Sequence, residues 1–299
     1  LFDGYRIPSI RRLMRKPQTV CFEPLLNYNP KLSTPATKEA VIDRYQSKLS
    51  VNCTPLIDPS IDEVMTLITP SLSRPLNERL IIHYFGQGSI SPSKSGAIFF
   101  FDKNHSTYKG IQVGKIIPSA AQGSKTPAPV ALIIDVNSAG ALCSELHKIL
   151  QSKSSNFIAF LSCDKGETLP AAPSLPYDIL SSAILFPSKT AIWFQAIRSS
   201  LNVKDAASLF TESESLARLS TDPSFLSFLN SVIDSIAYSK LDQNTYDELL
   251  FEDPALTIVT RGFILAQRIL RYHNIHSISV PELPDFADSE LWAYLDFAL

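Results

Sequence analysis

Short apolar runs that end in small or polar residues alternate with helical patterns up to about residue 203. Such runs are typical of strands buried on both faces of a sheet, and apolar residues three or four apart are typical of helices. We expect strands at 19–22, 79–85, 97–101, 130–134 and 156–163, with 97–101 as the hairpin partner of 79–85. We expect helices at 37–49, 58–70, 141–150 and 177–185, the second of them beginning with a capping box of Ser60 and Glu63. This alternation predicts an α/β fold with a largely parallel sheet flanked by helices.

The sheet is organised around the apolar run 130–134 and the small, polar turn that follows it at 135–140. The segment 141–150 then carries apolar residues at helical spacing and reads as the crossover helix behind the strand. In open α/β sheets, ligands and catalytic groups collect beyond the carboxyl ends of the strands. Any chemistry is therefore expected near Asp135 and Ser138.

The pattern changes after residue 203, where apolar positions recur only at helical spacing. Helical stripes run through 225–237 and 255–272, and another begins near Ser289, while 208–220 reads as a linker or a loose surface helix. Successive helices with broad apolar faces suit the beginning of a HEAT- or armadillo-type α-solenoid. We predict a basic arm at 1–18, an α/β domain at 19–203 and a helical segment at 204–299.

The composition argues against several classes of function. The formal charge of −2 predicts no electrostatic affinity for nucleic acid or an anionic membrane. The four cysteines form no Cys-x-x-Cys pair, which argues against zinc and a disulfide framework and fits a reducing cytosol. No run reaches the roughly 18 apolar residues of a membrane span. We therefore expect a cytoplasmic protein without cofactor, metal or membrane insertion.

Two neighbouring strand ends, at 83–88 and 135–140, resemble the places where caspase-like peptidases carry their catalytic histidine and cysteine. Gln87 stands between two glycines where the histidine would be, and an amide cannot accept a proton near neutral pH. Val136 and Asn137 occupy the two positions where the cysteine could stand. The two strand ends thus resemble those of a caspase-like peptidase but lack the catalytic histidine and cysteine, and we predict no catalytic residue.

Other residues could in principle replace the missing cysteine and histidine. Ser138 is one residue further along the turn and is expected to cap the following helix. His83 lies within a strand and is expected to be packed, and the pair Cys143 and His147 lies on the flank of the crossover helix. Cys163 ends a strand nearer the site, where a buried, inert thiol is the usual case. A peptidase that uses Cys163 or Ser138 remains the alternative reading.

Motifs in order along nearly the whole chain resemble the N-terminal caspase-like domain of the Raptor family, regulatory subunits of target-of-rapamycin (TOR) complex 1. The family's His-Tyr-Asn-Gly-His-Gly turn resembles 83–88, with Phe85 and Gln87 as departures, and its Tyr-Asp-Cys-Ser-Asn-Ala-Gly turn resembles 134–140. Further similar segments are 15–20, 57–64, 101–108, 265–274 and 281–284. A caspase-like subunit of a membrane enzyme such as the GPI transamidase fits less well, because signal and membrane segments are missing and the helical tail matches Raptor.

The resemblance implies a non-catalytic scaffold, a pseudoprotease. In the family this domain precedes an α-solenoid, lies near the cleft of the TOR kinase, and helps to recruit substrate proteins that carry a TOR-signalling motif. Four residues of the matching helical segment could receive that motif: Arg268, Arg271, Tyr272 and Asn274. Arginine and tyrosine suit a motif with an acidic residue and an aromatic anchor. The resemblance also implies recruitment to the lysosomal or vacuolar surface.

Overall fold

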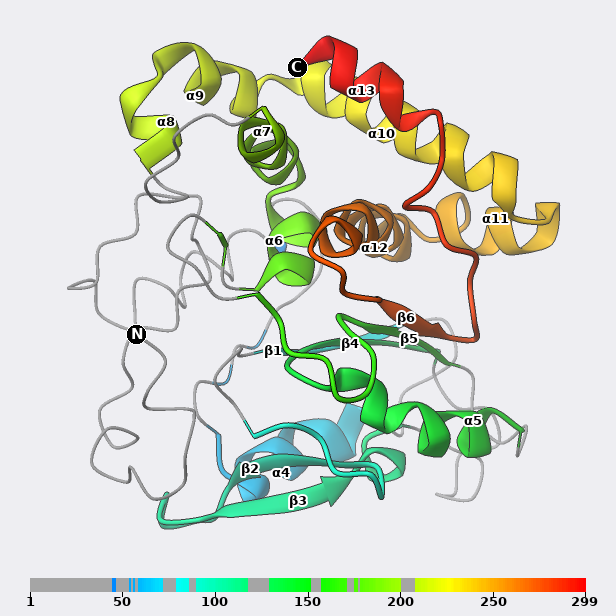
Figure 1. Cartoon of the computed structure of the whole chain (residues 1–299). Helices are drawn as coiled ribbons and strands as arrows, with labels where there is room; N and C mark the ends of the chain where they lie inside the picture. The colour runs from blue at the N-terminus through cyan, green and yellow to red at the C-terminus, as the bar shows by residue number, and fades with distance from the viewer. Residues whose placement is uncertain are drawn as a thin grey trace. The chain divides into compact units, whose positions relative to one another are not determined.

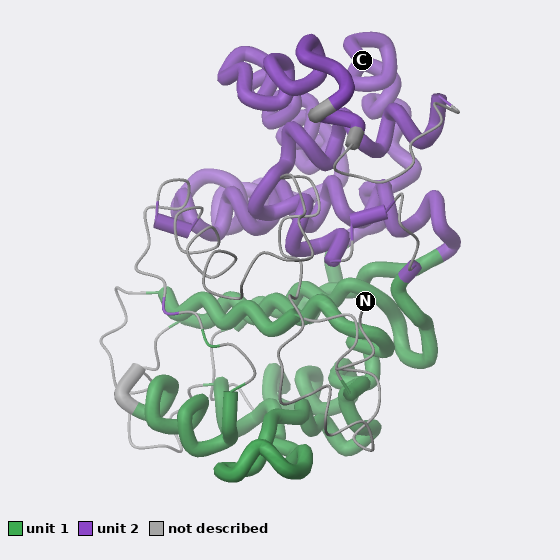
Figure 2. Tube along the Cα trace, turned by 90° about the vertical axis from the view of Figure 1, so that its left-hand side faces the viewer, with its two compact units in different colours: residues 1–20, 56–169, 275–283 green, residues 21–55, 170–274, 284–299 purple. Residues whose placement is uncertain are grey.

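The structure, a computed structural model, describes residues 45–46, 54, 56, 59–71, 79–85, 90–117, 129–151, 157–170, 175–176, 178–199 and 208–299. The chain forms two compact units, each assembled from separate stretches (Figure 2). Unit 1 comprises 1–20, 56–169 and 275–283, and unit 2 comprises 21–55, 170–274 and 284–299. The predicted basic arm and the strand predicted at 19–22 lie outside the described residues.

Unit 1 is built on a four-stranded sheet, in the order β1-β4-β5-β6, among the described residues (Figure 1). Its strands are β1 (Leu80–Phe85), β4 (Val130–Asp135), β5 (Phe157–Leu161) and β6 (Ile278–Val280). The pairs β1–β4 and β4–β5 are parallel, and β6 is antiparallel to β5. Every residue of β4 and β5 is buried, which explains why both strands are uninterrupted apolar runs. The predicted parallel sheet is confirmed.

A second, two-stranded sheet in unit 1 pairs β2 (Ala97–Phe101) with β3 (Tyr108–Gln112) in antiparallel register. Asp102 shapes the turn between them, because its carboxylate accepts hydrogen bonds from the backbone and hydroxyl groups of Ser106 and Thr107. The strand at 97–101 was expected to be the hairpin partner of 79–85, and this was wrong. The sequence of β3 is mixed polar and apolar, so it gave no strand signal.

The remaining elements of unit 1 are α4 (Ile61–Ser71), η1 (Val113–Lys115), η3 (Ala139–Leu142) and α5 (Cys143–Gln151). The capping box expected at the start of α4 is present. Ser60 donates from its backbone N–H to Glu63 Oε2 at 2.7 Å, and the Glu63 N–H donates to Ser60 Oγ at 3.3 Å. The predicted crossover helix is α5, which the short 3-10 turn η3 links to β4.

The regular elements among the described residues of unit 2 are all helices. Its elements are α6 (Ile179–Leu185), α7 (Pro187–Arg198), α8 (Ser208–Glu212), α9 (Glu214–Thr221), α10 (Pro223–Lys240), α11 (Gln243–Leu250), α12 (Pro254–Tyr272) and α13 (Trp292–Ala298). Helix α12 supplies much of the core, and Arg261 on it pairs with Asp234 of α10 through two bonds of 2.7 and 2.6 Å. The helical stripes read from the sequence correspond to α10 and α12.

One strand lies where only helices were expected. Residues 278–280 form β6 on the edge of the sheet, so the stretch 275–283 belongs to unit 1 although it follows α12 in the chain. Three residues before a proline carry too little pattern to be read as a strand. The domain boundary at residue 203 stays a prediction. Among the described helices none combines the length and apolar character needed to cross a bilayer.

Candidate functional site

The turn at the carboxyl end of β4 is where the degenerate catalytic position was expected. Asp135 ends the strand and is fully buried, and Ser138 adopts a left-handed backbone with φ of 56°. The N–H of Gly140 donates to the carbonyl of Cys163 at 2.9 Å. A β-carbon at Gly140 would lie 2.6 Å from the backbone nitrogen of Lys165, so only glycine allows the loops after β4 and β5 to approach this closely.

Both residues at the predicted cysteine position are parts of the scaffold. Val136 has no exposed surface, and its carbonyl accepts from Ser162 Oγ at 3.2 Å and from Cys163 Sγ at 3.3 Å. The side-chain oxygen of Asn137 accepts the N–H of Leu169 at 2.8 Å. Neither side chain offers a nucleophile. Gln87, the residue at the predicted histidine position, lies outside the described residues, so that half of the prediction stays a prediction.

Ser138 does not cap the next helix in the way the sequence suggested. It occupies the N-cap position of η3, but its side chain makes no capping hydrogen bond. Its hydroxyl instead donates to the carbonyl of Glu167 at 3.4 Å. The left-handed backbone of Ser138 turns the hydroxyl toward the loop after β5, which explains why the expected cap does not form.

The candidate thiols and imidazoles are unsuited to nucleophilic catalysis. Burial raises the pKa of Cys163 to about 11, and burial together with the charge of Asp164 raises the pKa of Cys143 to about 11. His147 Nδ1 lies 2.8 Å from the backbone carbonyl of Cys143. Strand β1 is half-buried, yet removal from water lowers the pKa of His83 to about 3. Both thiols are therefore protonated and His83 is neutral near pH 7.

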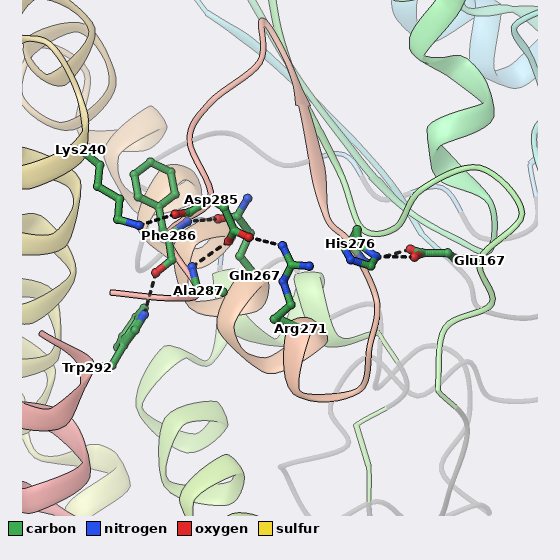
Figure 3. A network of polar contacts seen from close by, with 9 residues as sticks. All are labelled: Glu167, Lys240, Gln267, Arg271, His276, Asp285, Phe286, Ala287 and Trp292. Atoms are coloured by element: carbon green, nitrogen blue, oxygen red, sulfur yellow. Dashed lines mark hydrogen bonds and ion pairs between the residues drawn. The ribbon is translucent and has the colours of Figure 1, made fainter. Parts of the chain in front are cut away.

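Glu167 ties the loop after β5 to the segment before β6 within unit 1 (Figure 3). Its carboxylate accepts from the backbone N–H of His276 at 2.9 Å and of Asp164 at 2.9 Å, and it lies 2.7 Å from His276 Nδ1. Burial alone raises the pKa of Glu167, but the hydrogen bonds from His276 and Asp164 outweigh it, so this pKa is lowered overall.

Replacing Glu167 with glutamine is therefore expected to destabilise unit 1 by about 1 kcal/mol at pH 7. The lowered pKa means that the charged carboxylate contributes stability above its ordinary pKa, and that this contribution is lost as the pH falls through the lowered value. Urea unfolding at several pH values measures this contribution. The unfolding free energies of the unchanged protein and Glu167→Gln should become equal in acid. Glu282→Gln, at an exposed position just after β6, is the control. A constant difference down to pH 2 would contradict the account.

The four residues predicted to receive a substrate motif lie in unit 2, at the end of α12 and just beyond it. Arg268 is 8% exposed and pairs with Asp296 at 2.5 Å. Its guanidinium lies 4.6 Å from the ring of Trp292 and 5.5 Å from the ring of Phe194. Arg268 therefore holds α13 and α7 against α12, and its side chain is largely occupied inside the unit.

The other three predicted residues reach the surface. Tyr272 is 52% exposed and packs edge-on against Phe194 at 5.5 Å, and Asn274 is exposed with φ of 59°. Arg271 is half-exposed and pairs with Asp285 (Figure 3). Arg268 and Tyr272 thus share the ring of Phe194, whereas Arg271 pairs with the segment before α13. Sequence reasoning missed Asp285 because it is separated from the helix by β6.

The described residues hold no group of three or more His, Cys, Asp or Glu placed to bind a metal ion. The β4 turn therefore lacks a nucleophile among its predicted positions, and the end of α12 presents a cation, an aromatic ring and an amide to solvent.

Comparison with known proteins agrees with this fold. The family model for the Raptor N-terminal CASPase like domain matches residues 1–146. The crystal structure of Chaetomium thermophilum Raptor aligns with a TM-score of 0.74 and 23% identity, covering 93% of this chain and 27% of that chain. At this identity the structural match shows the fold, which is that of a caspase-like α/β domain with added helices.

Curated proteins with similar sequences are TOR-associated proteins. Regulatory-associated protein of TOR 1 from Arabidopsis thaliana is 29% identical over 253 residues, covering 81% of this chain and 18% of that protein. Target of rapamycin complex 1 subunit mip1 from Schizosaccharomyces pombe is 25% identical over 266 residues, covering 81% of this chain and 20% of that protein. The chain thus spans about a fifth of these relatives. Taken together, the matches agree with the predicted resemblance: the chain is similar in sequence and in fold to Raptor proteins, and its first half is similar to their N-terminal caspase-like domain.

Proposed function

We propose that this chain is the non-catalytic, caspase-like part of a TOR complex 1 subunit that binds the TOR kinase and recruits its substrates in growth and nutrient signalling. The relatives carry names of TOR complex subunits rather than of peptidases. The proposal places the protein in the cytoplasm, with recruitment to the lysosomal or vacuolar surface. The predicted solenoid, of which α10 to α13 would be the beginning, belongs to the same proposal.

The turn after β4 carries the non-catalytic part of the proposal. An acyl-transfer enzyme needs an exposed nucleophile next to a base. Here the carbonyl of Val136 and the amide of Asn137 bind the loop after β5, and the nearby Cys163 is a buried thiol with a raised pKa. The caspase-like fold is retained, and the side chains at its catalytic position serve stability.

The substrate-binding part of the proposal rests on the exposed end of α12. We place the acidic residue of a TOR-signalling motif at Arg271 and its aromatic anchor beside Tyr272, with Asn274 as a hydrogen-bonding neighbour. Arg268 contributes by holding Phe194, against which Tyr272 packs. A half-exposed arginine suits this role, since its guanidinium can donate hydrogen bonds to the carboxylate of a ligand without prior unfolding.

Replacing Arg271 with glutamate is expected to weaken binding of a labelled TOR-signalling motif peptide at least tenfold, because it turns a cation at the proposed contact into an anion. Fluorescence anisotropy measures the affinity. Arg218→Glu is the matched control, because Arg218 is exposed on α9 and pairs only along its own helix, with Glu214. Unchanged affinity in Arg271→Glu would remove the motif site from this end of α12.

A further inference from the structure

Residues 284–291, here called the strap, connect β6 to α13 and lie in unit 2 (Figure 3). The strap is pinned at Phe286, whose side chain has no exposed surface. The N–H of Phe286 donates to Gln267 Oε1 at 3.1 Å, and its carbonyl accepts from Trp292 Nε1 at 2.9 Å. These contacts hold the strap on α12 through the aromatic residue and its backbone.

Asp285, the neighbour of Phe286, brings two cations together. Its carboxylate accepts from the guanidinium of Arg271 and from the N–H of Ala287, the latter at 2.9 Å. Its backbone carbonyl accepts from Lys240 Nζ, on α10, at 2.6 Å. The side chains of Arg271 and Asp285 are both 37% exposed. Two positive charges from different helices therefore converge on one acidic residue at the surface of unit 2.

The cations have donors to spare. A guanidinium carries five N–H donors and an ammonium group three, and each gives one bond to Asp285 in the contacts above. Arg271 binds the carboxylate of Asp285 directly, and Lys240 binds the backbone carbonyl of the same residue. Such an arrangement suits a carboxylate ligand, with bidentate binding available at the arginine.

We propose that Arg271 and Lys240 form a carboxylate-binding subsite that the chain's own Asp285 fills, and that an acidic side chain of a bound peptide takes its place. The inference rests on the proposed substrate-recruiting function and adds its regulation. The strap itself presents an acidic residue next to an aromatic one, Asp285 and Phe286, which is the chemistry proposed for the incoming motif. The strap is therefore an internal competitor for the acidic part of the ligand.

The ion pair can open while the strap stays in place. Ion pairs between half-exposed side chains contribute little net stability, because water solvates both partners when they separate. Phe286 contacts Gln267 and Trp292 through its backbone N–H and carbonyl, and neither contact uses the carboxylate of Asp285. A competing acidic peptide needs to displace one side chain only.

The test measures binding of a TOR-signalling motif peptide to the purified protein and to Asp285→Asn. Asparagine keeps the acceptor for the Ala287 N–H and removes the charge that competes with the peptide. We expect Asp285→Asn to bind the peptide several-fold tighter, up to about fivefold, which corresponds to loss of a competing exposed ion pair. Asp288→Asn, an exposed strap residue, removes the same charge and should leave the affinity unchanged.

A second peptide, in which amides replace the acidic residues, allows two proteins to be compared with two peptides in a double-mutant cycle. Its affinity should be the same for the protein and for Asp285→Asn, because an amide does not compete for the carboxylate position. Adding Lys240→Met to Asp285→Asn should reverse the gain with the acidic peptide. If the acidic peptide binds the protein and Asp285→Asn with equal affinity, Asp285 does not compete with the peptide. The proposed recruiting function would then still stand. If neither protein binds the acidic peptide, both proposals fall.

Discussion

Replacing Gly262 with alanine is expected to destabilise unit 2 by about 2 kcal/mol. A β-carbon at Gly262 would lie 2.5 Å from Ile184 Cγ1 and 2.6 Å from Ile184 Cα. The second of these atoms is backbone of α6, which cannot rotate away, so α12 and α6 would have to separate. In an unhindered helix the same change would stabilise the protein by about 1 kcal/mol, because alanine has a higher helix propensity than glycine. The sign of the change in unfolding free energy therefore shows whether the close contact with Ile184 or the helix propensity dominates.

Thermal or urea unfolding measures this effect, and Gly114→Ala is the matched control. A β-carbon at Gly114 would lie 3.4 Å from Ile149 Cδ1, the end of a flexible side chain. We expect the Gly114 variant to unfold within about 0.5 kcal/mol of the unchanged protein. A stabilised Gly262→Ala would mean that α6 and α12 do not lie this close.

Replacing Asp296 with asparagine is expected to cost about 2 to 3 kcal/mol, toward the lower end of values for broken buried pairs because Asp296 is 27% exposed. Asp296 accepts from Arg268 at 2.5 Å and from Arg198 at 2.6 Å. Without the carboxylate, the charge of Arg268 is left buried between the rings of Phe194 and Trp292. Burial already lowers the pKa of Arg268, which reflects the same desolvation of its charged form.

The partner change Arg268→Met should cost less than Asp296→Asn. Methionine fills the space between the two rings, and Asp296 keeps its pair with Arg198. The double variant should be more stable than Asp296→Asn alone, since it contains no uncompensated buried cation. Urea unfolding of the three variants gives this order. If Asp296→Asn is as stable as the unchanged protein, Arg268 does not depend on Asp296.

The sequence predicted the elements whose signal is local. The apolar runs of β4 and β5, the capping box of Ser60 and Glu63, and the stripes of α10 and α12 each depend on residues close together in the chain. It also predicted that Val136 and Asn137 are not nucleophiles, because residue type alone decides this.

Pairings across long separations could not be predicted. Glu167 and His276 are 109 positions apart, and Arg268 and Asp296 are 28 apart. Which charged residues meet depends on how β6 and the strap return to the core, and the three residues of β6 carry too weak a pattern to reveal that return. For the same reason, neither the pairing of Arg268 with Asp296 nor the place of Asp285 beside Arg271 was predicted from the sequence.

Affinity capture from the cytosol of the source organism, with the full-length protein as bait and mass spectrometry as readout, tests the central claim most directly. The account predicts recovery of a large phosphatidylinositol-kinase-related kinase, together with no covalent labelling of the bait by cysteine- or serine-directed activity probes. Labelling of Cys163 or Ser138 by such a probe, with no kinase of this class recovered, would contradict the account.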